Sequence, residues 1–405
     1  MTLPYPSGTI LSDTRAHLLK LDEARRHIRH RHAAGLPLHN LSGLERRIDL
    51  PEVDPWILDD EWSGALYAEP LRELGLEHLG GESGRDDILV TNRLTAALYA
   101  AMQVTVRPGD TVVGVSPTYS HPAVTRAVRD AGGHLVETTV ADLAKTLATQ
   151  QNVAVVALTR LAVTYDALST EDLHHVVELA HAHGALVVVD DAGGARVGPA
   201  ILDQPRTLEF GADLGATGLD KYGVGGPRVG LLGGRTDLVA QARARAFELG
   251  TECRPALYPA VAQTLQDYRP QRVRDLVTQT HEVGAALRER LGPWIEQTPF
   301  ITRLPGKAIQ SELARRKPIA PMAPIEATAA LAMTLLRDHG LLTVHFAGLP
   351  PGTDALLIKF LPPETIATLG GPAAFATALD DALDQTAAAL TDEAATRRLL
   401  HGPLP

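Results

Sequence analysis

One lysine, Lys221, stands in a context that favours chemistry over solvation. It follows the apolar segment Asp213–Thr217 and precedes the glycine-rich connection Gly223–Pro227. Partial removal from water at the end of a buried strand lowers the pKa of a lysine and frees its amine to form an imine. The glycines would let the backbone approach a bulky ligand closely. We interpret Lys221 as an imine-forming lysine; a charged loop lysine is the alternative.

An acidic pair, Asp190 and Asp191, comes directly after the apolar run Leu186–Val189. Parallel sheets bind their ligands at the carboxyl ends of the strands. A carboxylate there can hydrogen-bond a protonated ring nitrogen, but two adjacent acids could also bind a metal or cap the next segment. Asp190 directly follows the apolar run, so we expect it, and not Asp191, to face the ligand.

A third segment, Thr91–Thr95, joins an expected strand to an expected helix. Unpaired N–H groups and the helix dipole favour an anion at such a turn. A phosphate would be held there by backbone N–H groups, the Thr95 hydroxyl and the Arg93 guanidinium. An ordinary helix N-cap is the alternative.

A fourth segment, Ser116–Pro122, offers Tyr119 and His121 as rings that could lie flat on an aromatic ligand; a satisfied loop histidine is the alternative. The four features together describe a pyridoxal phosphate (PLP) site. An acid against the pyridine nitrogen and a Schiff-base lysine are recurring marks of that cofactor. No metal site is expected.

The elements that must position these residues alternate between strands and helices. Strands are expected at Asp87–Val90, Thr111–Val115, His134–Thr138, Val153–Thr159, Ala185–Asp190, Asp213–Thr217 and Arg228–Leu232. Such alternation predicts a mainly parallel sheet with helices on both faces. A smaller α+β domain follows, with a helix at Ile325–Asp338 and strands at Leu341–Phe346 and Ala355–Phe360. The expected domains are an N-terminal segment at 1–60, a large domain at 61–285 and a small domain at 286–405.

The composition is that of a globular protein, with 405 residues, 45% of them hydrophobic, and a formal net charge of −10. A single cysteine excludes a disulfide framework. The N-terminus lacks the pattern of a signal peptide, and no apolar run reaches the ~20 residues that span a bilayer, so we expect a cytoplasmic location without a membrane partner. A basic run, Arg25–His32, lies on a helix expected at Asp22–Ala34. An RNA or metal patch is conceivable there, but a solvated helix face is the favoured interpretation.

Several segments resemble the archaeal-type proteins related to bacterial selenocysteine synthase (L-seryl-tRNA selenium transferase), which are PLP enzymes of fold type I. The resemblance spans roughly Leu76 to Phe360. The segments that carry it are Asp190-Asp191-Ala-Gly-Gly-Ala-Arg196-Val-Gly, Asp220-Lys221, Gly-Gly-Pro-Arg228-Val-Gly-Leu-Leu, Thr91-Asn92-Arg93 and Thr343-Val-His-Phe-Ala-Gly-Leu-Pro-Pro-Gly.

The resemblance implies an α/β fold of the aspartate-aminotransferase type and a set of site residues. Lys221 would form the internal aldimine, Asp190 would pair with the pyridine nitrogen and His121 would stack on the ring. The residues implied to bind the cofactor also include Asn92, Arg93, Leu94 and Thr95 around the phosphate, with Ala192 and Thr217 nearby. The family often places Ser or Thr within three residues before the lysine, whereas Thr217 is the nearest hydroxyl here.

The expected activity is that of a PLP-dependent lyase or transferase on a small amino-acid-like substrate, which enters as an external aldimine. Elimination or replacement at the β-carbon is the leading hypothesis, with amino transfer or aldol cleavage as the alternative. Candidates for the substrate carboxylate are Arg196, Arg228, Arg254 and Arg303, with Lys359 a weaker option. Relatives of this fold type place each site at a two-fold interface, so a homodimer or larger even oligomer is expected.

A selenium transferase acting on aminoacyl-tRNA is a further alternative. We find no counterpart of the bacterial N-terminal tRNA-binding domain, and the net charge is acidic. A nucleic-acid partner is therefore not expected.

Overall fold

The computed structural model describes residues 3–50, 52–346 and 349–403. The chain forms two compact units, which we call the sheet unit (Glu45–Val273) and the two-segment unit (Met1–Leu44 with Arg274–Pro405). These boundaries differ from the expected ones at residues 60 and 285. Residues after Leu44 join the sheet unit because their side chains bind it: Arg46 pairs with Asp220 at 2.8 Å, and Asp60 pairs with Arg254 at 2.7 Å.

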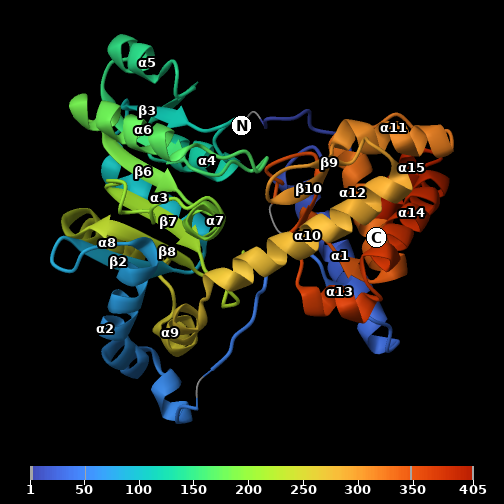
Figure 1. Ribbon diagram of the computed structural model, residues 1–405, viewed down its shortest axis with the longest axis horizontal. Helices are drawn as coiled ribbons and strands as arrows, with labels where there is room; N and C mark the ends of the chain where they lie inside the picture. Colours follow the sequence, from blue (N-terminus) through green and yellow to red (C-terminus); the bar gives the residue numbers. More distant parts are fainter. Residues whose placement is uncertain (1–2, 51, 347–348, 404–405) are drawn as a thin grey trace. The chain divides into compact units, whose positions relative to one another are not determined.

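The sheet unit is an α/β structure (Figure 1). Its strands are β2 (Asp86–Thr91), β3 (Thr111–Val115), β4 (His134–Thr138), β5 (Val153–Thr159), β6 (Leu186–Asp190), β7 (Leu214–Gly218) and β8 (Gly230–Arg235). Its helices are α2 (Asp60–Leu79), α3 (Leu94–Thr105), α4 (Pro122–Asp130), α5 (Leu143–Thr149), α6 (Thr170–Ala182), α7 (Gly194–Ile201), α8 (Thr236–Leu249) and α9 (Tyr258–Asp267). The seven expected strands are present: β3, β4 and β5 have the expected ends, and the ends of the other four shift by at most three residues.

The seven strands form one sheet in the order β2-β8-β7-β6-β5-β3-β4. Strand β8 runs antiparallel to both of its neighbours, and the other pairs are parallel. The carboxyl ends of β2, β3, β5, β6 and β7 therefore lie along one edge of the sheet. The predicted mainly parallel sheet is confirmed.

Both faces of this sheet carry apolar side chains, which are buried under helices. On one face, Val112, Val155 and Val188 pack with side chains of α3, α4 and α8. On the other, alternate residues such as Val156 and Val187 pack with α2, α5, α6 and α9. Strands covered on both faces have continuous apolar sequences. This explains why the expected strands showed no polar alternation.

The two-segment unit is an α+β structure built from both ends of the chain. Its strands are β1 (His39–Asn40), β9 (Glu296–Gln297), β10 (Ile301–Leu304), β11 (Leu341–Leu342) and β12 (Leu356–Lys359). Its helices are α1 (Thr14–Ala33), α11 (Gly306–Arg316), α12 (Pro324–His339), α13 (Pro363–Leu369), α14 (Pro372–Ala389) and α15 (Glu393–His401); α10 (Pro270–Leu291) begins in the sheet unit. Helix α12 is buried from Ile325 to Leu336 and forms the centre of the core.

Two expectations for this unit are wrong. The expected strand at Leu341–Phe346 ends at Leu342, and a short 3-10 helix, η3 (Val344–Phe346), follows it. His345 of η3 contacts the buried amine of Lys20 at 3.1 Å, so this segment packs toward α1. Helix α1 begins at Thr14 and not near residue 22, because Asp13 caps it by accepting from the Ala16 N–H.

Most of the basic run on α1 is engaged within the helix or its own unit. Arg25 and Arg26 pair with the preceding acids Asp22 and Glu23. Arg31 is buried and donates to backbone carbonyls, including that of Arg337 at 2.9 Å. Within the described part of the chain, no helix is both long and apolar enough to cross a membrane.

Candidate active site

Asp190 ends β6 at the middle of the sheet, paired in register with Thr159 of β5 and Ala216 of β7. The side chain is buried, and its Oδ1 has no hydrogen-bond partner among the described residues. Burial and the neighbouring Asp191 raise the pKa of Asp190 to about 6, although the Lys221 charge acts in the opposite direction. A buried carboxylate oxygen without a partner is costly and is suited to a ligand that donates a proton.

Asp191, by contrast, is bound by the protein itself. Its Oδ2 accepts from Arg160 at 2.7 Å and from the Thr207 hydroxyl at 2.7 Å. Its Oδ1 has no hydrogen-bond partner among the described residues, but it lies against Gly194, where a Cβ would come within 2.1 Å. Each acid thus has one oxygen without a partner among the described residues, but Asp191 is fully enclosed and tied to Arg160 and Thr207, whereas Asp190 keeps 6% of its surface exposed; Asp190 is therefore the better placed for a ligand.

Lys221 follows β7, the strand next to Asp190. Its side chain is 16% exposed and folds back over the strand end, since a Cβ at Gly218 would lie 3.0 Å from the lysine Nζ. Burial lowers the pKa of Lys221, and Asp220, 3.4 Å away, partly offsets that effect. Although burial alone would raise it, the charges of Lys221 and Arg46 hold the pKa of Asp220 at about 2.

The expected phosphate turn is the N-terminus of α3. Arg93 is the N-cap residue, and no side chain caps the helix. The carbonyl of Arg93 accepts from the Ala96 and Ala97 N–H groups, so the helix is formed from its first turn. Asn92, Arg93, Leu94 and Thr95 are exposed or half-buried. A helix terminus of this kind attracts an anion.

The remaining expected cofactor residues lie at the same edge of the sheet. His121 is the N-cap of α4, and its Nδ1 accepts from the Ala123 N–H at 3.0 Å. Thr217 is fully buried in β7, and its hydroxyl accepts from Arg196 at 2.8 Å. The carbonyl of Ala192 accepts from the same arginine at 2.6 Å, which fixes the loop after Asp190.

The carboxylate candidates differ strongly in position. Arg196 is fully buried, and both of its terminal nitrogens donate to protein atoms. Arg228 is exposed beside the glycine-rich connection, and its charge acts on Asp220. Arg254 is exposed and paired with Asp60. Two others lie in the two-segment unit: Arg303, paired with Glu296 at 2.6 Å, and Lys359, which is buried.

Sequence reasoning missed four residues of this site. Arg46, which reaches Asp220, lies in the N-terminal segment expected at 1–60. Arg160 directly follows β5 and pairs with Asp191. Tyr165 and Tyr222 hydrogen-bond each other through their hydroxyls, and both have left-handed backbones, with φ of 67° and 54°. Of these four residues, only Tyr222 could have been found from the sequence, because it is the chain neighbour of Lys221.

The residues present fit PLP. A buried carboxylate with an unpartnered oxygen, an amine with a lowered pKa and a helix N-terminus without a side-chain cap lie at the ends of β6, β7 and β2. These three groups complement a ring nitrogen, an aldehyde and a phosphate respectively. The described residues include no cluster of three or more acids, histidines or cysteines that could hold a metal ion.

Comparison with known proteins gives the family. Residues 71–349 match the family described as aminotransferase class I and II. The chain belongs to this family. It is also 32% identical over 320 residues to a pyridoxal phosphate-dependent protein of Methanothermobacter thermautotrophicus, covering 79% of this chain and 80% of that one. A pyridoxal phosphate-dependent protein of Methanosphaera stadtmanae is 28% identical over 315 residues, covering 77% and 80%. PLP is thus the cofactor of this chain, as predicted.

Solved structures agree on the fold. Pyridoxamine-pyruvate aminotransferase from Mesorhizobium loti superposes with a TM-score of 0.56 at 15% identity, covering 86% of this chain and 93% of that one. Aspartate aminotransferase from Thermotoga maritima gives 0.56 at 14% identity, covering 89% and 96%. The expected aspartate-aminotransferase-like fold is confirmed. The narrower resemblance to selenocysteine synthase stays a prediction.

Proposed function

We propose that this member of the aminotransferase family acts on the amino group of a small amino-acid-like substrate, with Lys221 and Asp190 as its central catalytic residues. The observation that carries the proposal is a buried carboxylate and a buried amine at the ends of two adjacent strands, β6 and β7. Asp190 has a buried oxygen that no described residue hydrogen-bonds, and Lys221 has an amine whose pKa is lowered by burial. PLP, when bound, attaches the substrate amine covalently and withdraws electrons from the bonds at its α-carbon.

The chain's own residues have separate tasks in this proposal. Asp190 holds a proton on the ring nitrogen, which keeps the ring electron-poor. The N–H groups at the start of α3, with Thr95 and Arg93, bind the phosphate. His121 stacks on the ring from the start of α4. Lys221 Nζ would accept and return the proton of the substrate α-carbon, because its lowered pKa makes the neutral amine accessible.

For the reaction, we propose elimination or replacement at the β-carbon. These reactions need a proton for the leaving group. Tyr222 is the chain neighbour of Lys221, and its hydroxyl hydrogen-bonds that of Tyr165; burial raises the pKa of both, to about 12 for Tyr222, so these hydroxyls stay protonated. Amino transfer is the second candidate, and the family match favours it. Arg228, exposed beside the lysine, is our candidate for the substrate carboxylate, ahead of the fully buried Arg196.

The decisive experiment begins with borohydride reduction of the PLP-loaded protein and peptide mapping. The adduct should lie on Lys221, and Lys221→Ala should form none. A protein that cannot be loaded with PLP would contradict the proposal. A panel of amino acids then separates the reactions. Ammonia released without an acceptor indicates elimination, whereas keto acid formed only with an added keto acid indicates amino transfer.

We also propose that the partner is a second copy of this chain and that the substrate is a free amino acid, not an aminoacyl-tRNA. The pairing of Arg25 and Arg26 with acids and the burial of Arg31 support the second part, since they lower the positive charge that α1 presents to phosphate. Sedimentation gives the oligomeric state. Turnover of aminoacyl-tRNA in place of free amino acids would instead support the selenium-transferase-like alternative.

A further inference from the structure

A fully buried ion pair lies directly behind the proposed ring-nitrogen acid. Arg160 is the first residue after β5, and Asp191 is the first residue after β6. Their side chains are both 0% exposed, and Arg160 Nη2 donates to Asp191 Oδ2 at 2.7 Å. Since Asp190 is the chain neighbour of Asp191 and pairs with Thr159, the ion pair and the proposed acid occupy adjacent positions on two strands.

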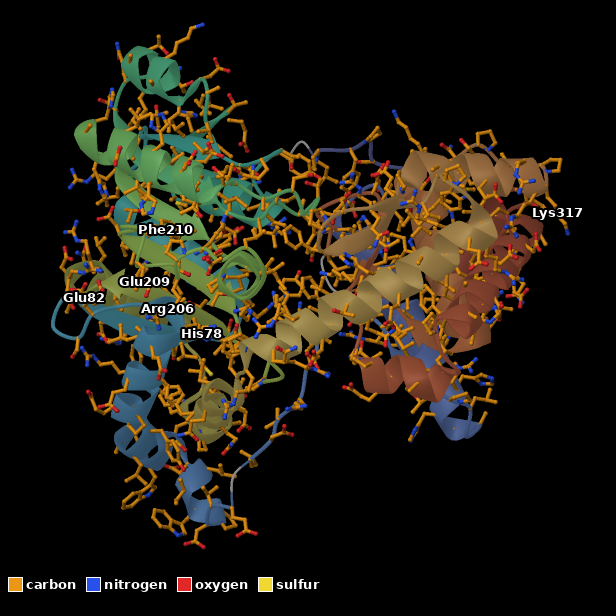
Figure 2. All side chains as sticks on the ribbon, viewed as in Figure 1. His78, Glu82, Arg206, Glu209, Phe210 and Lys317 are labelled. Carbon is orange, nitrogen blue, oxygen red and sulfur yellow. The ribbon has the colours of Figure 1, made fainter. Side chains whose placement is uncertain are left out.

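Several contacts hold this pair in one arrangement. The Thr207 hydroxyl donates to the same oxygen, Asp191 Oδ2, at 2.7 Å. Arg160 Nη1 donates to the carbonyl of Pro205 at 2.8 Å. The guanidinium also lies 4.9 Å from the centre of the Phe210 ring, which is labelled in Figure 2. The Arg160 charge is therefore fixed on Asp191 and is not available to swing toward a ligand.

Glycines make room for the pair. A Cβ at Gly194 would come within 2.1 Å of Asp191 Oδ1, and a Cβ at Gly198 would come within 2.3 Å of Arg160 Nη1. The small residues after Asp191, singled out in the sequence as part of the family resemblance, thus accommodate a buried guanidinium. Burying an ion pair is seldom more stabilising than burying apolar residues of the same size. A role beyond stability is therefore needed to explain it.

That role follows from charge. Asp190 and Asp191 are adjacent carboxylates in the interior, and a like charge nearby disfavours ionisation. Suppose that Asp191 were negative and unpaired. A proton shared between the Asp190 carboxylate and a ring nitrogen would then move toward the carboxylate, because the carboxylate is closer to the extra negative charge. The ring nitrogen would then be neutral and a weaker electron sink. Pairing with Arg160 offsets part of the Asp191 charge, although Asp191 still raises the pKa of Asp190, and this smaller net charge lets the proton stay on the ring.

We propose that Arg160 is a positioning residue that neutralises Asp191 and so allows Asp190 to keep its negative charge against the protonated ring nitrogen of the cofactor. The inference rests on the proposed role of Asp190. It assigns to Arg160 and Asp191 an electrostatic function that acts through Asp190 and not by contact with the substrate.

The test follows the ring nitrogen directly, by ¹⁵N NMR of protein loaded with ring-labelled PLP. Wild type should show a protonated nitrogen at neutral pH. Arg160→Gln leaves Asp191 unpaired and should show an unprotonated nitrogen. Arg160→Lys keeps the charge, and the double variant Arg160→Gln/Asp191→Asn removes both charges, so both should retain protonation. The pH midpoint of Asp190 protonation in Arg160→Gln should rise by about 1–3 units.

The matched control is Arg206→Gln. Arg206, labelled with Glu209 in Figure 2, also pairs with a carboxylate of the sheet unit, at 2.6 Å, but the two side chains are 42% and 37% exposed, whereas those of Arg160 and Asp191 are 0% exposed. This variant should leave the ring nitrogen protonated. The proposal is overturned if folded Arg160→Gln keeps a protonated nitrogen. Should Arg160→Gln fail to fold, an unprotonated nitrogen in either the lysine variant or the double variant overturns it. Absence of a borohydride adduct on Lys221 in wild type would instead contradict the proposed function.

Discussion

Replacement of Asp190 by asparagine should change two measurable quantities, the affinity for PLP and the pH dependence of stability. The unpartnered oxygen of Asp190 is the proposed partner of the ring nitrogen, and a hydrogen bond to a charged group is worth about 1.5–3 kcal/mol. Since 1.4 kcal/mol corresponds to a factor of about ten, Asp190→Asn should weaken PLP binding by about 10–150-fold. Equilibrium dialysis or cofactor absorbance measures this directly.

The protein without cofactor should respond differently. Burial raises the pKa of Asp190 from 3.8 to about 6. The folded chain therefore holds more protons than the unfolded chain between these values, so this group's contribution to stability is full below about pH 4 and lost as pH rises through about 6. The loss is about 3 kcal/mol, at 1.36 kcal/mol per unit. In denaturant titrations at several pH values, Asp190→Asn should lack this loss.

Asp191→Asn is the matched comparison. It should lower the stability of the fold and affect PLP affinity less than Asp190→Asn does. It leaves the buried Arg160 charge without a partner, which typically lowers the free energy of unfolding by about 3–5 kcal/mol. The reasoning is refuted if folded Asp191→Asn loses more PLP affinity than Asp190→Asn, because the acid facing the cofactor would then be Asp191.

Three further predictions concern other parts of the chain. Thr95→Val should weaken PLP binding about tenfold or more but leave binding of unphosphorylated pyridoxal unchanged, since only the phosphate contact is lost, as dialysis with each ligand would show. Burial lowers the pKa of Lys20 from 10.5 to about 7, so the unfolded chain holds more protons between these values and stability should rise with pH across them. Lys20→Met should abolish that rise in denaturant titrations. Filter binding should detect no salt-sensitive tRNA complex at physiological ionic strength; micromolar binding lost in Arg25→Ala/Arg26→Ala/Arg29→Ala/Arg31→Ala would contradict this.

Much of the sheet unit was predictable because its strands have strong local signals. Runs such as Val153–Thr159 are continuous, apolar and bounded by polar residues, and the structure has this strand with the same ends. The placement of Asp190 at a strand's carboxyl end followed from the rule that parallel sheets bind ligands there, whereas the adjacency of β6 and β7, which brings Lys221 beside it, comes from the structure.

Partners distant in the sequence were not predictable. Nothing local indicates that Arg160 pairs with Asp191, or that Arg46 reaches Asp220 across 174 positions. The end of the strand at Leu342 was missed for the same reason, since His345 contacts Lys20, which lies 325 positions away. Local propensity gives elements, whereas these contacts depend on the packing of the whole unit.

The arrangement of the sheet bears on how such an enzyme could acquire new substrates. The proposed site draws on segments that follow five different strands, and the segments after β3 and β5 each include exposed or half-buried residues, at 117–119, 163–164 and 166–167. Loops of this kind tolerate changes of length and sequence well. The segment after β6 is different, because contacts at Gly194 and Gly198 leave no room for a larger side chain. A library varied at residues 117–119, 163–164 and 166–167, which are exposed or half-buried, should therefore alter substrate range while the segment from Asp190 to Gly198 preserves the cofactor chemistry.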